Sequence, residues 1–236
     1  MHRLGFTRSA HRADHLLQTE DTFVRAPRPG MKKATAIVHV APARGARFTQ
    51  YTAEFEPGGC LGPAEGQRFV YVTEGSLRVD ERPLGPGGFA YLPAGSMAAV
   101  NAVEQSWAAV IEKPYVEGAA AKAPRALIGQ EQDVEASPLG GDRDLMVRCL
   151  IPDDPAYDFA VNTMVYQPGA ALPMVEIHVM EHGLLMLEGG GIYRLGESWY
   201  PVTAGDFIWM APYCPQWFGA LGKSPAKYLI YKDWNR

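Results

Sequence analysis

Apolar and polar residues alternate in short stretches along much of this chain, and turn-forming residues separate these stretches. Runs rich in Val, Tyr, Phe and Ile occupy residues 48–55, 68–73 and 88–92, and each is followed by a Gly-containing turn sequence (PGG, EG and PAG). Apolar and polar residues that alternate with a period of two, in stretches separated by turns about every 8 to 12 residues, are typical of β-sandwiches and β-barrels made of short strands. The pattern therefore predicts an all-β protein.

The same order of strand and turn signals occurs twice. The separation between matching signals grows slowly along the chain, from 111 to 114 and then 118 residues, as small loop insertions in a duplicated domain would produce. The matching segments are PGG at 57–59 and PGA at 168–170, VYVTEG at 70–75 and LMLEG at 185–189, and GGFAYLP at 87–93 and GDFIWMA at 205–211. We expect one β-barrel at residues 31–125 and a second at 126–236.

Residues 1–30 contain few strand signals. We expect an N-terminal arm that packs on a neighbouring subunit of a homo-oligomer, with a disordered tail as the alternative. The segment lacks the apolar core of a secretion signal and carries Asp14, Glu20 and Asp21, which argues against an organelle presequence.

The composition of the chain excludes some classes of binding partner. A net charge of -4 without any basic block gives no reason to expect nucleic acid or an anionic membrane, and no run approaches the roughly 18 apolar residues of a spanning helix. The three widely spaced cysteines, Cys60, Cys149 and Cys214, form neither a disulfide framework nor a metal knuckle. These features indicate a cytoplasmic protein whose partners are small molecules or other proteins.

The densest chemistry lies in VEIHVMEHG at residues 175–183. Its second half, HVMEH, fits the H-x-x-E-H pattern of inverted zinc proteases, in which two histidines share a helical face. A helix is disfavoured by Pro168, Gly169 and Pro173 upstream and by the glycines at 183 and 189–191 downstream.

An extended strand gives a different grouping, because alternate residues then share a face. Glu176, His178 and His182 would project into the barrel, and Glu181 would point away. Val175, Ile177 and Val179 would line the opposite side of a sheet buried on both faces. A hydrogen-bonded polar core is one explanation of three such inward side chains, but a bound metal is the better one, since unpaired buried polar groups are costly.

These residues resemble the cupins, small β-barrels whose first motif is G-x5-H-x-H-x3-4-E-x6-G and whose second is G-D-x4-P-x-G-x2-H-x3-N. Here the first motif reads Glu176-x-His178-x3-His182-x6-Gly189, with Glu and His exchanged, and the second begins at Gly205-Asp206 and places Gln216 at the last histidine. The resemblance implies two tandem cupin (jelly-roll) barrels. It also implies four metal ligands: Glu176, His178, His182 and Gln216.

The corresponding positions of the first repeat are Gly62, Ala64, Arg68 and Ala98, none of them a plausible metal ligand. The first barrel is therefore predicted to lack the metal and to have a structural or interface role.

The Glu-x-His-x3-His spacing followed by Pro-Gln-Trp is similar to the ureidoglycine aminohydrolase family of bicupins, most densely from residue 176 to 236. Two imidazoles, a carboxylate and an amide oxygen suit Mn²⁺ or Fe²⁺, and the resemblance selects Mn²⁺. It implies hydrolytic release of ammonia from ureidoglycine, giving ureidoglycolate in purine breakdown. The alternatives are an Fe²⁺ cupin dioxygenase acting on a small acid and a non-catalytic cupin that binds a carboxylate metabolite.

By position, the resemblance adds Lys232, Tyr193 and Tyr228 as candidate catalytic residues. Tyr228 and Lys232 are separated by an even number of positions, so one strand face can present both. The two tyrosines are otherwise explained as core aromatics with hydrogen-bonded hydroxyls.

The remaining chemistry-bearing residues have simpler explanations. Glu181 is expected to make a structural hydrogen bond, and Trp209 and Trp217 to form barrel and pocket walls. Cys214 is expected to be a small packing residue or an oxidation-sensitive one. The remaining histidines receive no catalytic role, and His39 is expected to be a hydrogen-bonded strand residue. The other histidines are His2, His11 and His15.

Overall fold

The computed structural model describes residues 5–117 and 123–234, and its regular structure is almost entirely β-strand. Helical residues within these ranges are confined to short 3-10 turns at Glu20–Thr22 (η1), Pro42–Arg44 (η2) and Glu131–Asp133 (η3). In the described ranges, none of the helices has the length and apolar character needed to span a bilayer. The prediction of an all-β protein is confirmed.

Two compact units make up the chain. The N-terminal unit contains residues 24–135 and 148–160, and the C-terminal unit contains the described residues up to Phe23 together with 136–147 and 161 onward. One sheet belongs mainly to the N-terminal unit. Its strands are β3 (Arg25–Ala26), β4 (Met31–Val40), β5 (Thr49–Leu61), β6 (Gln67–Glu74), β7 (Leu77–Val79), β8 (Arg82–Leu84), β9 (Gly88–Leu92), β10 (Val100–Ala102), β11 (Ser106–Lys113) and β12 (Leu127–Gln130).

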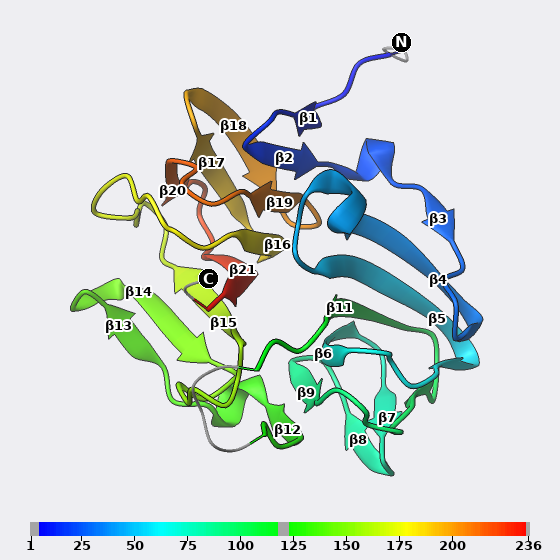
Figure 1. Ribbon diagram of the computed structural model, residues 1–236. Helices are drawn as coiled ribbons and strands as arrows, with labels where there is room; N and C mark the ends of the chain where they lie inside the picture. The colour runs from blue at the N-terminus through cyan, green and yellow to red at the C-terminus, as the bar shows by residue number, and fades with distance from the viewer. Residues whose placement is uncertain (1–4, 118–122, 235–236) are drawn as a thin grey trace. The chain divides into compact units, whose positions relative to one another are not determined.

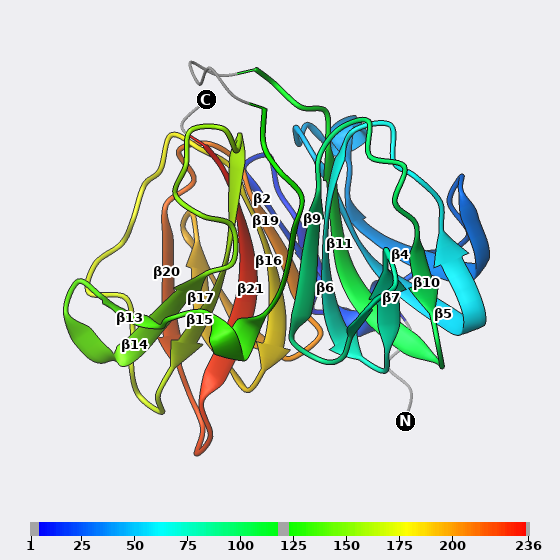
Figure 2. The ribbon, with the colours of Figure 1, turned by 90° about the horizontal axis from the view of Figure 1, so that it is seen from below.

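Two further sheets belong mainly to the C-terminal unit. The larger contains β1 (Ala10–His11), β2 (His15–Gln18), β13 (Ser137–Leu139), β14 (Asp142–Cys149), β15 (Phe159–Tyr166), β16 (His182–Glu188), β19 (Phe207–Met210) and β21 (Ala226–Asp233). The smaller contains β17 (Gly190–Leu195), β18 (Ser198–Thr203) and β20 (Gln216–Ala220). Figures 1 and 2 show these strands in each unit.

The two units repeat one strand order, as the duplicated sequence signals predict. The order β9-β6-β11-β5 in the N-terminal unit corresponds to β19-β16-β21-β15 in the C-terminal unit (Figure 2). The register of the paired strands is also the same. Arg68 on β6 stands opposite Glu112 on β11, and at the corresponding place in the other unit His182 on β16 stands opposite Lys232 on β21. Each unit encloses its own core of buried aliphatic and aromatic side chains.

The N-terminal segment joins the C-terminal unit of its own chain. Strand β2 pairs antiparallel with β19 (Figure 1). His15 stands opposite Met210 in the register, and Leu17 is fully buried in the core. Arg8 donates two hydrogen bonds of 2.9 Å to the carboxylate of Asp206. The arm predicted for residues 1–30 is therefore divided. The part up to Phe23 completes the C-terminal sheet, whereas the following residues join the N-terminal unit through β3 and β4.

The division between the units also differs from the predicted boundary at residues 125 and 126, because residues 148–160 belong to the N-terminal unit. Asp158 explains this placement. Its buried carboxylate forms an ion pair with Lys113 and accepts hydrogen bonds from the Gln67 side chain and from the Val116 backbone N–H. These contacts fasten the segment to β6 and to the end of β11.

We expect Asp158→Ala to lower the free energy of unfolding by roughly 3 to 5 kcal/mol, because it leaves the Lys113 ammonium buried without its partner. Urea unfolding of the variant and the wild type measures the difference. The control is Glu81→Ala, which removes an exposed partner of Arg78 and should change stability by at most about 1 kcal/mol. A loss of that small size for Asp158→Ala would show that the pair does not hold the segment.

Candidate metal centre

The segment before β16 is neither a helix nor a regular strand. Between Pro173 and Glu181 the segment forms one isolated β-bridge. In this bridge Glu176 and Gln216 exchange backbone hydrogen bonds of 2.8 and 2.9 Å. The helical H-x-x-E-H interpretation is thereby excluded. The expectation of a continuous strand is also wrong, since β16 begins only at His182.

The apolar residues of this segment lie on the surface rather than in a two-sided sheet. Val175, Ile177 and Val179 are 38%, 60% and 47% exposed. The prediction that they would be buried is wrong because one isolated bridge supplies no neighbouring strand or second layer to cover them.

The predicted ligands nevertheless come together from three segments. Nε2 of His178 lies 3.0 Å from a carboxylate oxygen of Glu176, and the rings of His178 and His182 have centroids 5.0 Å apart. Gln216, the first residue of β20, is bridged to Glu176 through the backbone. The side-chain oxygen of Gln216 accepts a hydrogen bond of 3.3 Å from the Tyr193 hydroxyl. A second link fixes the segment, since the His178 carbonyl accepts the Tyr213 N–H at 2.6 Å.

This donor set fits a divalent metal ion. Burial above all, together with the nearby His178 and Lys232, lowers the pKa of His182 to about 3, so its imidazole is neutral as a ligand must be. Nδ1 of the same ring is buried and has no hydrogen-bond partner within the described ranges. A polar side chain that served only to pack the core would be hydrogen-bonded. Imidazole, carboxylate and amide oxygen together suit Mn²⁺ or Fe²⁺.

Lys232 and Tyr228 share the inner face of β21. Lys232 is half-buried and stands directly opposite His182 in the strand register. Tyr228 and Ile230, at the alternate positions, belong to the core of the C-terminal barrel, so the same face carries Lys232 to the site.

The tyrosines near the centre are protonated donors. Burial raises the pKa of Tyr193 and of Tyr228 well above the ordinary value for a phenol. The hydroxyls of Tyr228 and Tyr166 lie 2.7 Å apart. Tyr166 was not predicted from the sequence, although an aromatic residue just before the Pro168-Gly169 turn of a predicted strand was a signal for it.

Comparison with known proteins gives the family. A family model described as Cupin domain matches residues 162–231. The (S)-ureidoglycine aminohydrolase of Arabidopsis thaliana is 38% identical over 239 residues, covering 98% of this chain and 80% of that protein. The enzyme of the same name from Escherichia coli strain K12 is 32% identical over 235 residues, covering 93% of this chain and 88% of that protein. This chain belongs to the (S)-ureidoglycine aminohydrolase family.

A solved structure has the same fold. Protein Ylba from E. coli matches with a TM-score of 0.86 and 26% identity, covering 98% of this chain and 95% of that chain. The predicted cupin fold of this ureidoglycine aminohydrolase family member is confirmed.

In this family member, the N-terminal barrel has an ion pair at the position that corresponds to the metal centre. Arg68 donates hydrogen bonds of 2.8 and 2.7 Å to Glu112 and one of 2.6 Å to the Gly62 carbonyl. Arg28 adds a hydrogen bond of 3.1 Å to the same carboxylate. The register places Arg68 where the other barrel has His182, and Glu112 where it has Lys232. Positive guanidinium groups at this place are unsuited to a cation.

The aromatic and acidic residues beside the centre have structural roles, as predicted. Trp209 donates its indole N–H to the buried carboxylate of Glu181 at 2.9 Å. Trp217 donates its indole N–H to the Leu172 carbonyl at 2.7 Å. Glu181 therefore stands apart from the ligands, as expected.

The other histidines and Cys214 are also placed. His39 is buried on β4, 2.8 Å from the Thr52 hydroxyl, and His11 is exposed on β1. His2 lies outside the described residues. Cys214 is a buried member of the core, as expected, and burial together with Asp14 raises the pKa of its thiol to about 11. A protonated thiol reacts slowly with oxidants. His15, to which the sequence analysis assigned no role, is buried, and its Nδ1 lies 2.9 Å from a carboxylate oxygen of Asp14.

Proposed function

We propose that this chain hydrolyses (S)-ureidoglycine to (S)-ureidoglycolate and ammonia, a step in the breakdown of purine-derived allantoin. The observation that carries the proposal is the identity to the Arabidopsis enzyme, which extends over 98% of the chain. The clustering of Glu176, His178, His182 and Gln216 supports it from the structure.

The proposed cofactor is Mn²⁺, held by the two imidazoles, the Glu176 carboxylate and the Gln216 amide oxygen. When bound, the ion supplies a Lewis acid and a template for the carboxylate and amine of the substrate. The donor set contains no thiolate, which favours Mn²⁺ or Fe²⁺ over softer ions, and the family assignment favours Mn²⁺ of these two.

The reaction breaks the bond between the central carbon and the amine nitrogen, and a bond from that carbon to a water oxygen replaces it. The amine leaves with an added proton as ammonia, and the ureido group is retained. A proton must therefore move from water to the departing nitrogen. Lys232, opposite His182, is the proposed charged group at the substrate, either as partner of its carboxylate or as the carrier of that proton.

Tyr193 and Tyr228 are proposed to bind the ureido arm. Their raised pKa values keep both hydroxyls protonated at neutral pH, so neither acts as a base. Tyr228 can donate to the ureido oxygen, whereas Tyr193, whose proton is directed to Gln216, can accept a hydrogen bond from a ureido N–H. The Tyr193 hydroxyl also orients the Gln216 side chain.

The wider organisation is part of the proposal. We retain the assignment of a structural barrel in the N-terminal unit and a catalytic barrel in the C-terminal unit, and the expectation of a cytoplasmic homo-oligomer. The Arg68–Glu112 ion pair supports the first point. Light scattering of the purified protein tests the oligomer.

The substrate is tested with freshly generated ureidoglycine in ¹⁸O-labelled water. We expect ammonia and ureidoglycolate in equal amounts, with the label in the new hydroxyl group. Oxygen consumption without ammonia would instead support the dioxygenase alternative. Saturable binding without turnover would support a metabolite-binding cupin.

A further inference from the structure

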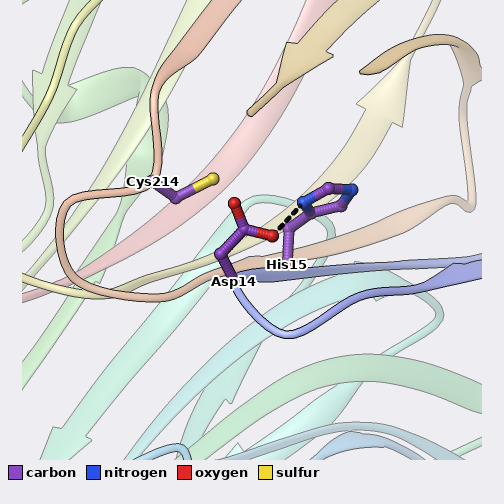
Figure 3. A group of neighbouring side chains, drawn as sticks. All are labelled: Asp14, His15 and Cys214. Atoms are coloured by element: carbon purple, nitrogen blue, oxygen red, sulfur yellow. Dashed lines mark hydrogen bonds and ion pairs between the residues drawn. The ribbon is translucent and has the colours of Figure 1, made fainter. Parts of the chain in front are cut away.

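A second group of metal-ligating side chains lies in the C-terminal unit, apart from the proposed ligands of the metal centre. Asp14 and His15, at the start of β2, meet Cys214 of the loop between β19 and β20 (Figure 3). A carboxylate oxygen, a ring nitrogen and the thiol sulfur, one atom from each residue, all lie within 4.8 Å of one another. The three side chains come from segments about 200 positions apart in the sequence, so their meeting is a product of the fold.

The histidine of this group has a partner at each ring nitrogen. Nδ1 of His15 lies 2.9 Å from an Asp14 carboxylate oxygen, and Nε2 lies 2.9 Å from the Tyr200 hydroxyl. A hydrogen bond from one ring nitrogen orients a metal-binding histidine for an ion at the other nitrogen. Tyr200 can keep Nε2 in this way, and an ion between Nδ1 and Asp14 would replace the hydrogen bond that now joins these two groups.

The burial of this group also suits a bound ion that enters from solvent. His15 and Cys214 are almost fully buried, whereas the Asp14 side chain is 47% exposed and connects the group to solvent. An ion can therefore enter at Asp14 and meet two ligands held rigidly by the core.

We propose that Asp14, His15 and Cys214 form a second metal site, for Zn²⁺ or a similar thiophilic divalent ion, with water as the fourth ligand. The thiolate, the carboxylate and a neutral imidazole carry two negative charges in total, which balance the charge of the ion. Sulfur, nitrogen and oxygen donors in a four-coordinate site are typical of zinc. The donor set differs from that of the metal centre in containing sulfur, so the two sites prefer different ions.

Such a site would fix the loop that leads into β20, whose first residue is Gln216. The Asp14 carbonyl accepts the Ala211 N–H at 2.9 Å, and the Ala211 carbonyl accepts the Cys214 N–H at 3.1 Å. Cys214 is two positions before Gln216. An ion bound here would tie the N-terminal segment to this loop, and so hold one proposed ligand of the metal centre in place. The site itself does not depend on the proposed function.

Cobalt tests the proposal, because Co²⁺ bound to a thiolate gives an intense near-ultraviolet charge-transfer band. The proposed ligands of the metal centre include no sulfur, so the band cannot come from that centre. We expect the band when Co²⁺ is added to the purified full-length protein, and we expect Zn²⁺ to remove it.

Three variants locate the signal. Cys214→Ser should lose the band, and Cys149→Ser, which alters an exposed cysteine, should keep it. Asp14→Asn leaves the buried residues in place and should weaken Co²⁺ binding by about tenfold or more. Circular dichroism verifies that each variant is folded. No band in the wild type, a band retained in Cys214→Ser, or unchanged affinity in folded Asp14→Asn would overturn the proposal.

Discussion

Replacing Glu176 or His178 by alanine is expected to abolish both the bound manganese and the release of ammonia from ureidoglycine. Each residue is one of the four proposed ligands, and the segment that carries them is held by one backbone bridge and by the hydrogen bond from the Tyr213 N–H to the His178 carbonyl rather than by a sheet. The remaining ligands are too few to retain the ion against the water that competes for it. Metal analysis of the purified variants and an ammonia assay measure the two losses.

These variants should fold, because the Glu176 and His178 side chains are 29% and 35% exposed and neither belongs to the core. Matched controls are Glu188→Ala and His11→Ala, which remove an exposed glutamate and an exposed histidine and should leave metal content and activity unchanged. Full activity in a variant that has lost its metal would contradict the assignment of these ligands.

Lys232→Met is expected to lower kcat by roughly 100-fold to 10,000-fold, the usual contribution of a positioned acid or base, while manganese remains bound. Methionine retains most of the apolar stem but removes the ammonium group of the residue that pairs with His182 across the strands. Steady-state kinetics at saturating Mn²⁺, with the metal content measured on the same sample, give the result. The control is Lys227→Met on the same strand, because residues at odd separation point to the opposite face.

Lys232→Arg distinguishes the two proposed roles of this residue. Arginine keeps the positive charge but does not release its proton in proteins. If Lys232 binds the substrate carboxylate, arginine should restore KM and most of kcat. If it carries the proton, arginine should restore KM and leave kcat low. A Lys232→Met variant within tenfold of the wild type in kcat would exclude the proton carrier, and one within tenfold in both kcat and KM would exclude both roles.

The sequence was informative where function depends on local spacing. The alternation that separates Glu176 and His178 from Glu181 identified the group of candidate ligands, although the segment proved irregular. The spacing survives because the backbone is extended at the Glu176–Gln216 bridge, even without neighbouring strands. The same irregularity explains why Ile177 is exposed, since periodicity indicates which residues share a face but not whether anything covers that face.

Contacts between distant segments were not predictable from the sequence. The pairing of β2 with β19 joins His15 to Met210, and a short strand of four residues gives little periodic signal. Asp158 appeared to belong to the connector between the repeats, and only its burial against Lys113 assigns it to the N-terminal unit. In each case a single long-range contact decides the outcome.

The duplication provides an internal comparison. The cross-strand pair at the centre is His182 and Lys232 in one barrel and Arg68 and Glu112 in the other, at the same register. An ion pair that satisfies its own charges needs no cation, whereas a neutral histidine beside a carboxylate is suited to bind one. The sequence alone predicted that the two barrels differ in metal binding. The corresponding strands occur in both repeats, and the residue types at the ligand positions are what changes between them.

A titration of metal-free protein with Mn²⁺ tests the central claim most directly, with bound manganese and ammonia release from (S)-ureidoglycine measured on the same samples. We predict that activity is absent at the start, rises in proportion to the bound ion and reaches its maximum at one Mn²⁺ per chain. Full ammonia release by the metal-free protein, or none by the protein saturated with Mn²⁺, would contradict the account.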